Sequence, residues 1–80
     1  MGELADAKQY LEQAIEGCRA TSCRGAEAAF TGSLGELLSF KDRAGGLALI
    51  ARARALLTEL GEQVELDKLE AREARVRAAP

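Results

Sequence analysis

Two cysteines, Cys18 and Cys23, carry the most reactive side chains of this chain, and four residues separate them. A zinc site takes about four ligands. The chain contains no histidine, so zinc would require a dimer that pools the cysteines of two copies. A disulfide across a turn is geometrically allowed if a helix ends between them, although a cytosolic setting disfavours it. We interpret Cys18 as a buried helix residue and Cys23 as incidental, and we predict neither metal nor cofactor.

The carboxylates offer no better basis for catalysis. Glu12 and Glu16 share one helix face, which a solvated helix surface explains. Without histidine, a nucleophile would need a lysine or a carboxylate as its base, and the sequence shows no cluster of polar residues that suggests a pocket. No phosphate-binding loop of the G-x4-G-K-[ST] kind occurs. We therefore predict that the protein is not an enzyme and has no catalytic residues.

A nucleic-acid-binding protein is the alternative function. Ala28, Gly32 and Leu38 have the spacing of a helix-turn-helix skeleton. That pattern expects apolar residues beside the alanine and on both sides of the glycine, where this chain has Glu27, Thr31 and Ser33. The helix that would read DNA also has few basic or amide side chains. The segment GSLG matches the G-x-x-G loop of KH domains, but the strands of that fold are absent from the pattern.

Composition predicts an all-α fold. The 80 residues are 48% hydrophobic and 30% charged, which is typical of one small folded domain. Alanine, leucine, glutamate and arginine dominate, whereas β-branched and aromatic residues are scarce. We expect a small antiparallel helical bundle or a helical hairpin with a charged C-terminal helical extension.

The most hydrophobic stretch does not predict a membrane span. The apolar run over residues 45–51 is far shorter than the roughly 20 residues that a bilayer requires. Arg52 and Arg54 follow it directly, and arginine is costly in lipid. The N-terminus also lacks the pattern of a secretory signal. We expect a small acidic cytoplasmic protein, and its alanine-, arginine- and glutamate-rich composition suggests a bacterial or phage origin.

The first helix is expected over residues 3–18. Its apolar residues recur in steps of three and four on one face, namely Leu4, Ala7, Leu11, Ala14 and Cys18. The stretch 17–25 then interrupts this pattern. A short helix is expected after it, closed by the residues TGS at 31–33. Ser33 and Glu36 have the spacing of a capping box, which predicts that a new helix starts there. Gly45 and Gly46 favour a break slightly over a bend.

A helix over residues 47–60 has two usable faces. Placed at about 100° per residue, one arc that faces the domain's own core carries Leu49, Ile50, Ala53, Leu56, Leu57 and Leu60. Ala48, Ala51 and Ala55 gather on another side. The stems of Arg52 and Arg54 lie at the seams between these faces. Six residues of the whole chain are predicted to be largely buried, namely Leu11, Ile15, Leu38, Leu49, Leu56 and Leu60.

The remaining segment is strongly helical but weakly amphipathic. We expect residues 1–61 to form the helical core domain and residues 62–80 a charged helical extension, which either frays or docks on something else. Two pairs of opposite charge have helical spacing in this extension, Glu65 with Lys68 and Glu73 with Arg77.

Charge is distributed unevenly along the chain. Residues 1–16 and 59–70 are acidic, residues 41–54 are basic, and the net charge is −2. This distribution suits antiparallel helices that pair with each other or with other copies, although a mixed solvated surface explains it equally well. We predict a non-enzymatic protein–protein interaction module, which is a homo-oligomer or part of a larger complex and serves as an adaptor, chaperone or inhibitor.

The predicted partner-binding residues are Ala48, Ala51, Ala55, Arg52 and Arg54, facing a second copy or another helical protein with an acidic surface. The competing expectation is that this alanine face packs on the first helix of the same chain. No membrane partner is expected, and nucleic acid is not the preferred partner.

Overall fold

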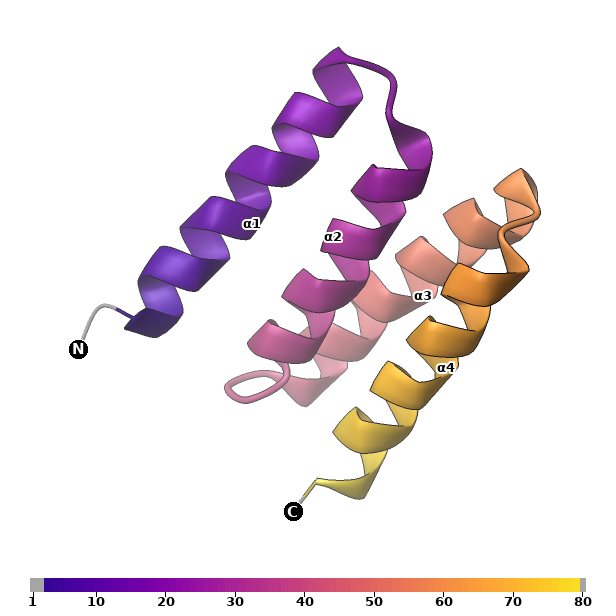
Figure 1. Ribbon diagram of the computed structural model, residues 1–80. Helices are drawn as coiled ribbons and strands as arrows, with labels where there is room; N and C mark the ends of the chain where they lie inside the picture. Colours follow the sequence, from indigo (N-terminus) through magenta and orange to yellow (C-terminus); the bar gives the residue numbers. More distant parts are fainter. Residues whose placement is uncertain (1–2, 80) are drawn as a thin grey trace.

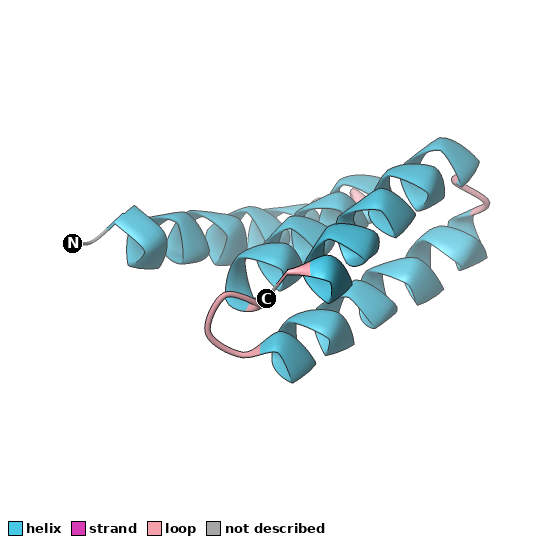
Figure 2. Ribbon diagram, turned by 90° about the horizontal axis from the view of Figure 1, so that it is seen from below, coloured by secondary structure: helices cyan, strands magenta, loops and turns pink. Residues whose placement is uncertain are grey.

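Four α-helices make up the computed structural model, which describes the backbone of residues 3–79 and the side chains of residues 5–79 (Figure 1). They are α1 (Glu3–Ala20), α2 (Arg24–Leu38), α3 (Arg43–Leu60) and α4 (Gln63–Ala78). No strand occurs in the described range, which confirms the all-α prediction. Loops of only two to four residues make consecutive helices antiparallel, as Figure 2 shows. Within this range no helix combines the length and apolar character of a membrane span.

The helices predicted over residues 3–18 and 47–60 are confirmed as α1 and α3, and both are somewhat longer than predicted. Leu4 of the predicted apolar stripe has a side chain outside the described residues. Two boundaries were wrong. Helix α2 runs without interruption through residues 31–33, so no new helix starts at Ser33. The break near Gly45 and Gly46 lies just before them, at residues 39–42.

Asp42 explains where α3 begins. Its backbone is extended, and its side chain accepts a hydrogen bond of 2.9 Å from the amide of Gly45. An aspartate in this position satisfies one of the amides that the first helical turn leaves unpaired. The glycine pair therefore lies inside the first turn of α3.

Helices α1 and α3 end in the same hydrogen-bonded cap, which requires one residue in the left-handed conformation. In α3 this residue is Gly61 (φ 73°), and the amide of Glu62 donates to the carbonyl of Leu57 at 3.0 Å. In α1 it is Ser22 (φ 60°), and the amide of Cys23 donates to the carbonyl of Cys18 at 2.8 Å. The α1 cap thus holds a serine in a conformation that glycine adopts more easily.

The crossing of α2 and α3 depends on two glycines. A Cβ atom added to Gly35 would lie 2.7 Å from the carbonyl oxygen of Gly46, closer than real contacts allow. A Cβ atom added to Gly46 would lie 2.8 Å from the Cβ atom of Ser39. Both glycines therefore let two backbones approach each other, and this packing outweighs their low helix propensity.

The hydrophobic core lies among α2, α3 and α4. Its buried residues form one cluster, namely Ala28, Ile50, Ala53, Leu57, Leu69 and Val76. Leu69 and Val76 belong to α4, so the C-terminal segment docks on its own chain and is not an exposed extension. Whether residues 1–61 form a domain without it stays a prediction.

The predicted core was only partly right. Of its six residues Ile15 alone is buried, and the other five are half-buried, namely Leu11, Leu38, Leu49, Leu56 and Leu60. The predicted core-facing arc of α3 is confirmed at Ile50, Ala53 and Leu57, which are buried because α2 and α4 cover that side of the helix. Leu49 lies on the flank of this arc, where no other helix covers it completely.

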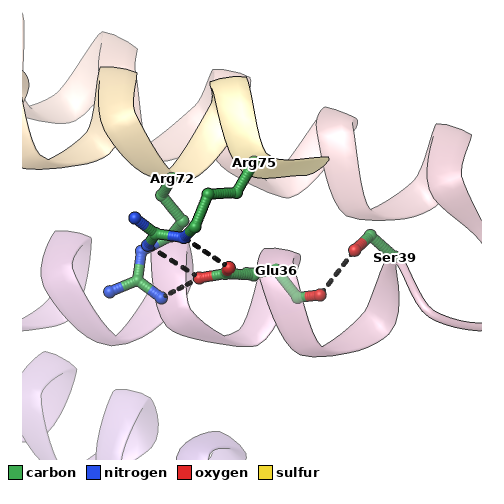
Figure 3. Close-up of polar contacts among 4 residues, drawn as sticks. All are labelled: Glu36, Ser39, Arg72 and Arg75. Atoms are coloured by element: carbon green, nitrogen blue, oxygen red, sulfur yellow. Dashed lines mark hydrogen bonds and ion pairs between the residues drawn. The ribbon is translucent and has the colours of Figure 1, made fainter. Parts of the chain in front are cut away.

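Polar contacts fasten α4 to α2. The carboxylate of Glu36, which α2 holds facing α4, accepts hydrogen bonds from Arg72 Nη1 at 2.7 Å and from Arg75 Nε at 3.0 Å (Figure 3). The hydrogen bond from Arg75, together with the charges of both arginines, holds the pKa of Glu36 below its usual value despite partial burial, which opposes this shift. Glu36 thus joins two helices and does not cap the start of one.

Candidate protein-binding surface

The alanine face of α3, formed by Ala48, Ala51 and Ala55, points away from the molecule. All three residues are exposed, and they lie on the side of the helix opposite the buried Ile50 and Ala53. The competing expectation, that this face packs on α1, is wrong, because no Cα atom of α1 lies within 8 Å of α3 or α4 in the described residues. The face is therefore available to a partner.

The two arginines predicted beside the alanine face have different surroundings. Arg54 is half-buried and forms an ion pair with Glu73 of α4, which also accepts a hydrogen bond of 2.8 Å from Arg77. The positive charge of Arg54 is thus matched within the chain. Arg52 lies on the opposite border and is exposed toward α1.

Helix α1 packs on α2 alone, at one edge of a flat molecule whose principal extents are 33, 26 and 16 Å (Figure 1). Because α1 does not reach α3, a cavity of about 430 Å³ opens between them. Its apolar lining comes from all three helices, through Ile15 of α1, Leu34 and Leu38 of α2, and Leu49 of α3. The half-buried state of the two leucines Leu38 and Leu49 follows from this opening.

A second cavity of about 200 Å³ continues the first toward the start of α1. It is lined by Ala5, Leu37 and Lys41, and it shares Lys8 and Leu38 with the larger cavity. We call the two together the α1 groove. Its walls are α1 and α3, and its floor is α2.

Three of the four basic residues that line the α1 groove differ from those of the rest of the molecule, whereas the fourth, Arg19, is paired with Glu16 and Glu27. The three are Lys8, Lys41 and Arg52, and none of these side chains has a hydrogen-bond or ion-pair partner among the described residues. The other basic side chains all contact an acid or a carbonyl group, for example Arg24 with Glu59 at 3.3 Å. The unmatched positive charge of the described structure is therefore concentrated in one apolar groove.

Acidic side chains occupy the middle of the same groove. Glu12 has no partner among the described residues, whereas Glu16 lies 3.7 Å from Arg19, whose Nε donates to Glu27 at 3.1 Å. The end of the groove near Lys8 is consequently basic, and its centre is acidic on the α1 side. The two parts of the groove therefore differ in the charge that a bound partner would meet.

The two thiols and the predicted helix-turn-helix segment do not form a site among the described residues. Cys18 is half-buried, Cys23 is exposed, and both are free thiols. The described residues contain no group of three or more side chains that could hold a metal ion. Residues 28–38 lie within one continuous helix, so the turn that a helix-turn-helix requires at Gly32 does not form.

Sequence reasoning placed Arg52 correctly at the border of two faces but missed the groove that it borders. Lys8 had one signal, because it is the single basic residue among acids in the first 16 positions. Lys41 belongs to the basic stretch 41–54, but its place in the groove depends on which helices touch. No protein-family model, no curated protein and no solved structure matches the chain.

Proposed function

We propose that this chain is a non-enzymatic protein–protein interaction module, which binds a second copy of itself or another helical protein. The α1 groove carries this proposal, because it leaves half-buried leucines beside three basic side chains that have no partner among the described residues, whereas the other basic side chains are paired. Proteins of this size rarely expose such a combination unless a partner covers it. The roles of adaptor, chaperone and inhibitor are all compatible with this proposal.

The alanine face of α3 adds a second contact region beside the groove. Its side chains are small, so another helix could approach the α3 backbone closely. Arg52 borders both the face and the groove, which makes one continuous surface of the two. We propose Ala48, Ala51, Ala55 and Arg52 as partner-binding residues and give Arg54 a supporting place, since Glu73 already neutralises it.

The variant Ala51→Glu tests the proposal. Ala51 is exposed, so the substitution should leave the helical circular dichroism signal and the melting temperature unchanged. The expected result is loss of self-association in sedimentation, or of binding to a protein from the native host. Ala26→Glu is the matched control, because Ala26 is exposed on α2 and lines neither groove nor face. Equal binding by both variants and the wild type would contradict the proposed role of this face.

No observation of the structure favours the nucleic-acid alternative, since the helix-turn-helix geometry is absent from residues 28–38. A cytoplasmic location and a bacterial or phage origin stay predictions from the sequence. Binding to DNA that weakens steeply with salt would reverse the preference for a protein partner.

A further inference from the structure

We infer that the α1 groove of one copy receives the outer face of α4 from a second copy. This inference rests on the proposed function and names the partner and the two surfaces. The groove offers unmatched positive charge and an apolar floor. The outer face of α4 offers unmatched negative charge and small apolar side chains.

The acidic side of the contact lies on α4. Glu62 and Glu70 have no side-chain partner among the described residues, and Asp67 accepts only one neutral hydrogen bond, of 2.9 Å from Gln63. Val64, on the same exposed part of the helix, is 67% exposed, which is high for a valine. The alanines of this face, Ala71, Ala74 and Ala78, are exposed as well and present no bulk to an approaching helix.

The basic side is the end of the groove near Lys8. Lys8 and Lys41 flank an apolar cavity floored by Leu37 and Leu38, and Arg52 lies on the α3 wall. Val64, one helical turn before Asp67, matches such a site, because its side chain can enter the cavity while the carboxylates of Asp67 and Glu70 meet Lys8 and Lys41. Glu12 in the middle of the groove repels acids, so we expect the α4 carboxylates toward the Lys8 end.

The two surfaces lie on different parts of the molecule. The groove is formed by α1, α2 and α3, whereas α4 lies at the opposite edge from α1 (Figure 1). One copy can therefore use its groove and its α4 at the same time. Such a head-to-tail contact builds either a closed ring or an open chain, not a two-fold dimer through a single patch.

Charge reversal in the purified protein tests this pairing. One variant carries Lys8→Glu and Arg52→Glu in the groove, and the other carries Asp67→Lys and Glu70→Lys on α4. Sedimentation equilibrium should show that the wild-type mass rises with concentration and that each variant alone associates at least about tenfold more weakly, because like charges then meet. An equimolar mixture of the two variants should restore association to within about threefold of the wild type, since opposite charges face each other again.

The control carries Arg24→Glu, a charge reversal outside both surfaces, and it should associate like the wild type. Weaker association at high salt is also expected. A wild type that stays monomeric up to about 1 mM overturns the inference. So does association that survives both reversals, or a mixture that fails to recover.

These failures remain distinguishable from failure of the proposed function. If the wild type is monomeric but binds a host protein, and Ala51→Glu abolishes that binding, the interaction module stands and the second copy is the wrong occupant. If association is lost only in Ala51→Glu, the alanine face is the interface and the pairing of groove with α4 is wrong.

Discussion

The two sides of helix α2 pack very differently, tightly against α3 and loosely against α1. Toward α3 it presents Gly35, which brings two backbones into contact, and the cluster of fully buried residues lies beside this crossing. Toward α1 it presents Leu34, which is buried, and Leu38, which is covered only in part. On the α3 side the two helix backbones touch, whereas on the α1 side a groove remains open.

The same contrast separates α4 from α1. Helix α4 contributes two residues to the core cluster and is held by Glu36 on α2 and by Arg54 on α3. Among the described residues, helix α1 contributes none to that cluster, and its one ion pair with another helix joins Arg19 to Glu27. We infer that α2, α3 and α4 form the stable body and that α1 is an attached helix that shapes the groove.

The largest expected effect comes from shortening a buried side chain in the body formed by α2, α3 and α4. Ile50 is fully buried, so Ile50→Ala should lower the free energy of unfolding by about 2–5 kcal/mol. Leu11→Ala, on the half-buried face of α1, should cost clearly less, about 1 kcal/mol. Urea denaturation followed by circular dichroism measures both, and Ile50→Val keeps the comparison measurable if the alanine variant does not fold. Equal losses for the two helices would contradict the division into body and attached helix.

Glycine substitutions give the next largest effect, with opposite signs in the two regions. Gly35→Ala and Gly46→Ala should each destabilise by about 1–3 kcal/mol, because the added methyl group meets backbone or Cβ atoms of the facing helix. Gly17→Ala in α1 should stabilise by up to about 1 kcal/mol, because nothing lies within 4 Å of the added Cβ atom. Thermal melts decide the sign. Stabilisation by Gly35→Ala would mean that α2 and α3 do not cross where described.

A smaller effect is expected at the carboxylate that joins α2 to α4. Glu36→Gln should cost about 1 kcal/mol at neutral pH, since it removes a partly buried charge from two arginines. The pKa of Glu36 lies below its usual value of 4.5 in the folded state. Its contribution to stability is therefore complete above that value and is lost as the pH falls through the folded-state pKa.

Denaturation between pH 7 and pH 3, with Glu70→Gln as the control at low protein concentration, tests this pH dependence. The gap between wild type and Glu36→Gln should close in acid, whereas Glu70→Gln should track the wild type throughout. A gap that stays constant with pH would show that the ion pair is not what Glu36 contributes.

The smallest effect concerns the two helix caps. Ser22→Gly should stabilise by about 0.5–1 kcal/mol, because glycine adopts a φ of 60° without the strain that a side chain adds. Gly61→Ala should destabilise by about 1 kcal/mol for the same reason. Loss of stability in Ser22→Gly would indicate that the serine side chain matters more than its backbone conformation.

Local patterns allowed part of this structure to be predicted. The burial of Ile50 and the exposure of the alanine face on α3 follow from helical periodicity, as does the position of Arg52 at a border. The pairs Glu65 with Lys68, at 3.4 Å, and Glu73 with Arg77, at 2.8 Å, follow from helical spacing. These features depend only on residues within one helix, so sequence reasoning could reach them.

The errors all involve contacts between distant residues. Gly32 and Gly46 signal breaks when only their own backbone is considered, but helix packing keeps both inside helices. Glu36 has the local spacing of a cap, yet its partners lie 36 and 39 positions further along the chain. The α1 groove exists because α1 contacts α2 and not α3, a choice that no local pattern contains.

Native-state hydrogen exchange at low protein concentration tests most directly whether α1 is an attached helix on a three-helix body. Amides in the middle of α1 should exchange through an opening that costs at least about 1–2 kcal/mol less than global unfolding. The central amides of α2 and α3 should exchange only through global unfolding. Equal opening free energies for α1 and α3 would show one cooperative unit and contradict the division on which the groove depends.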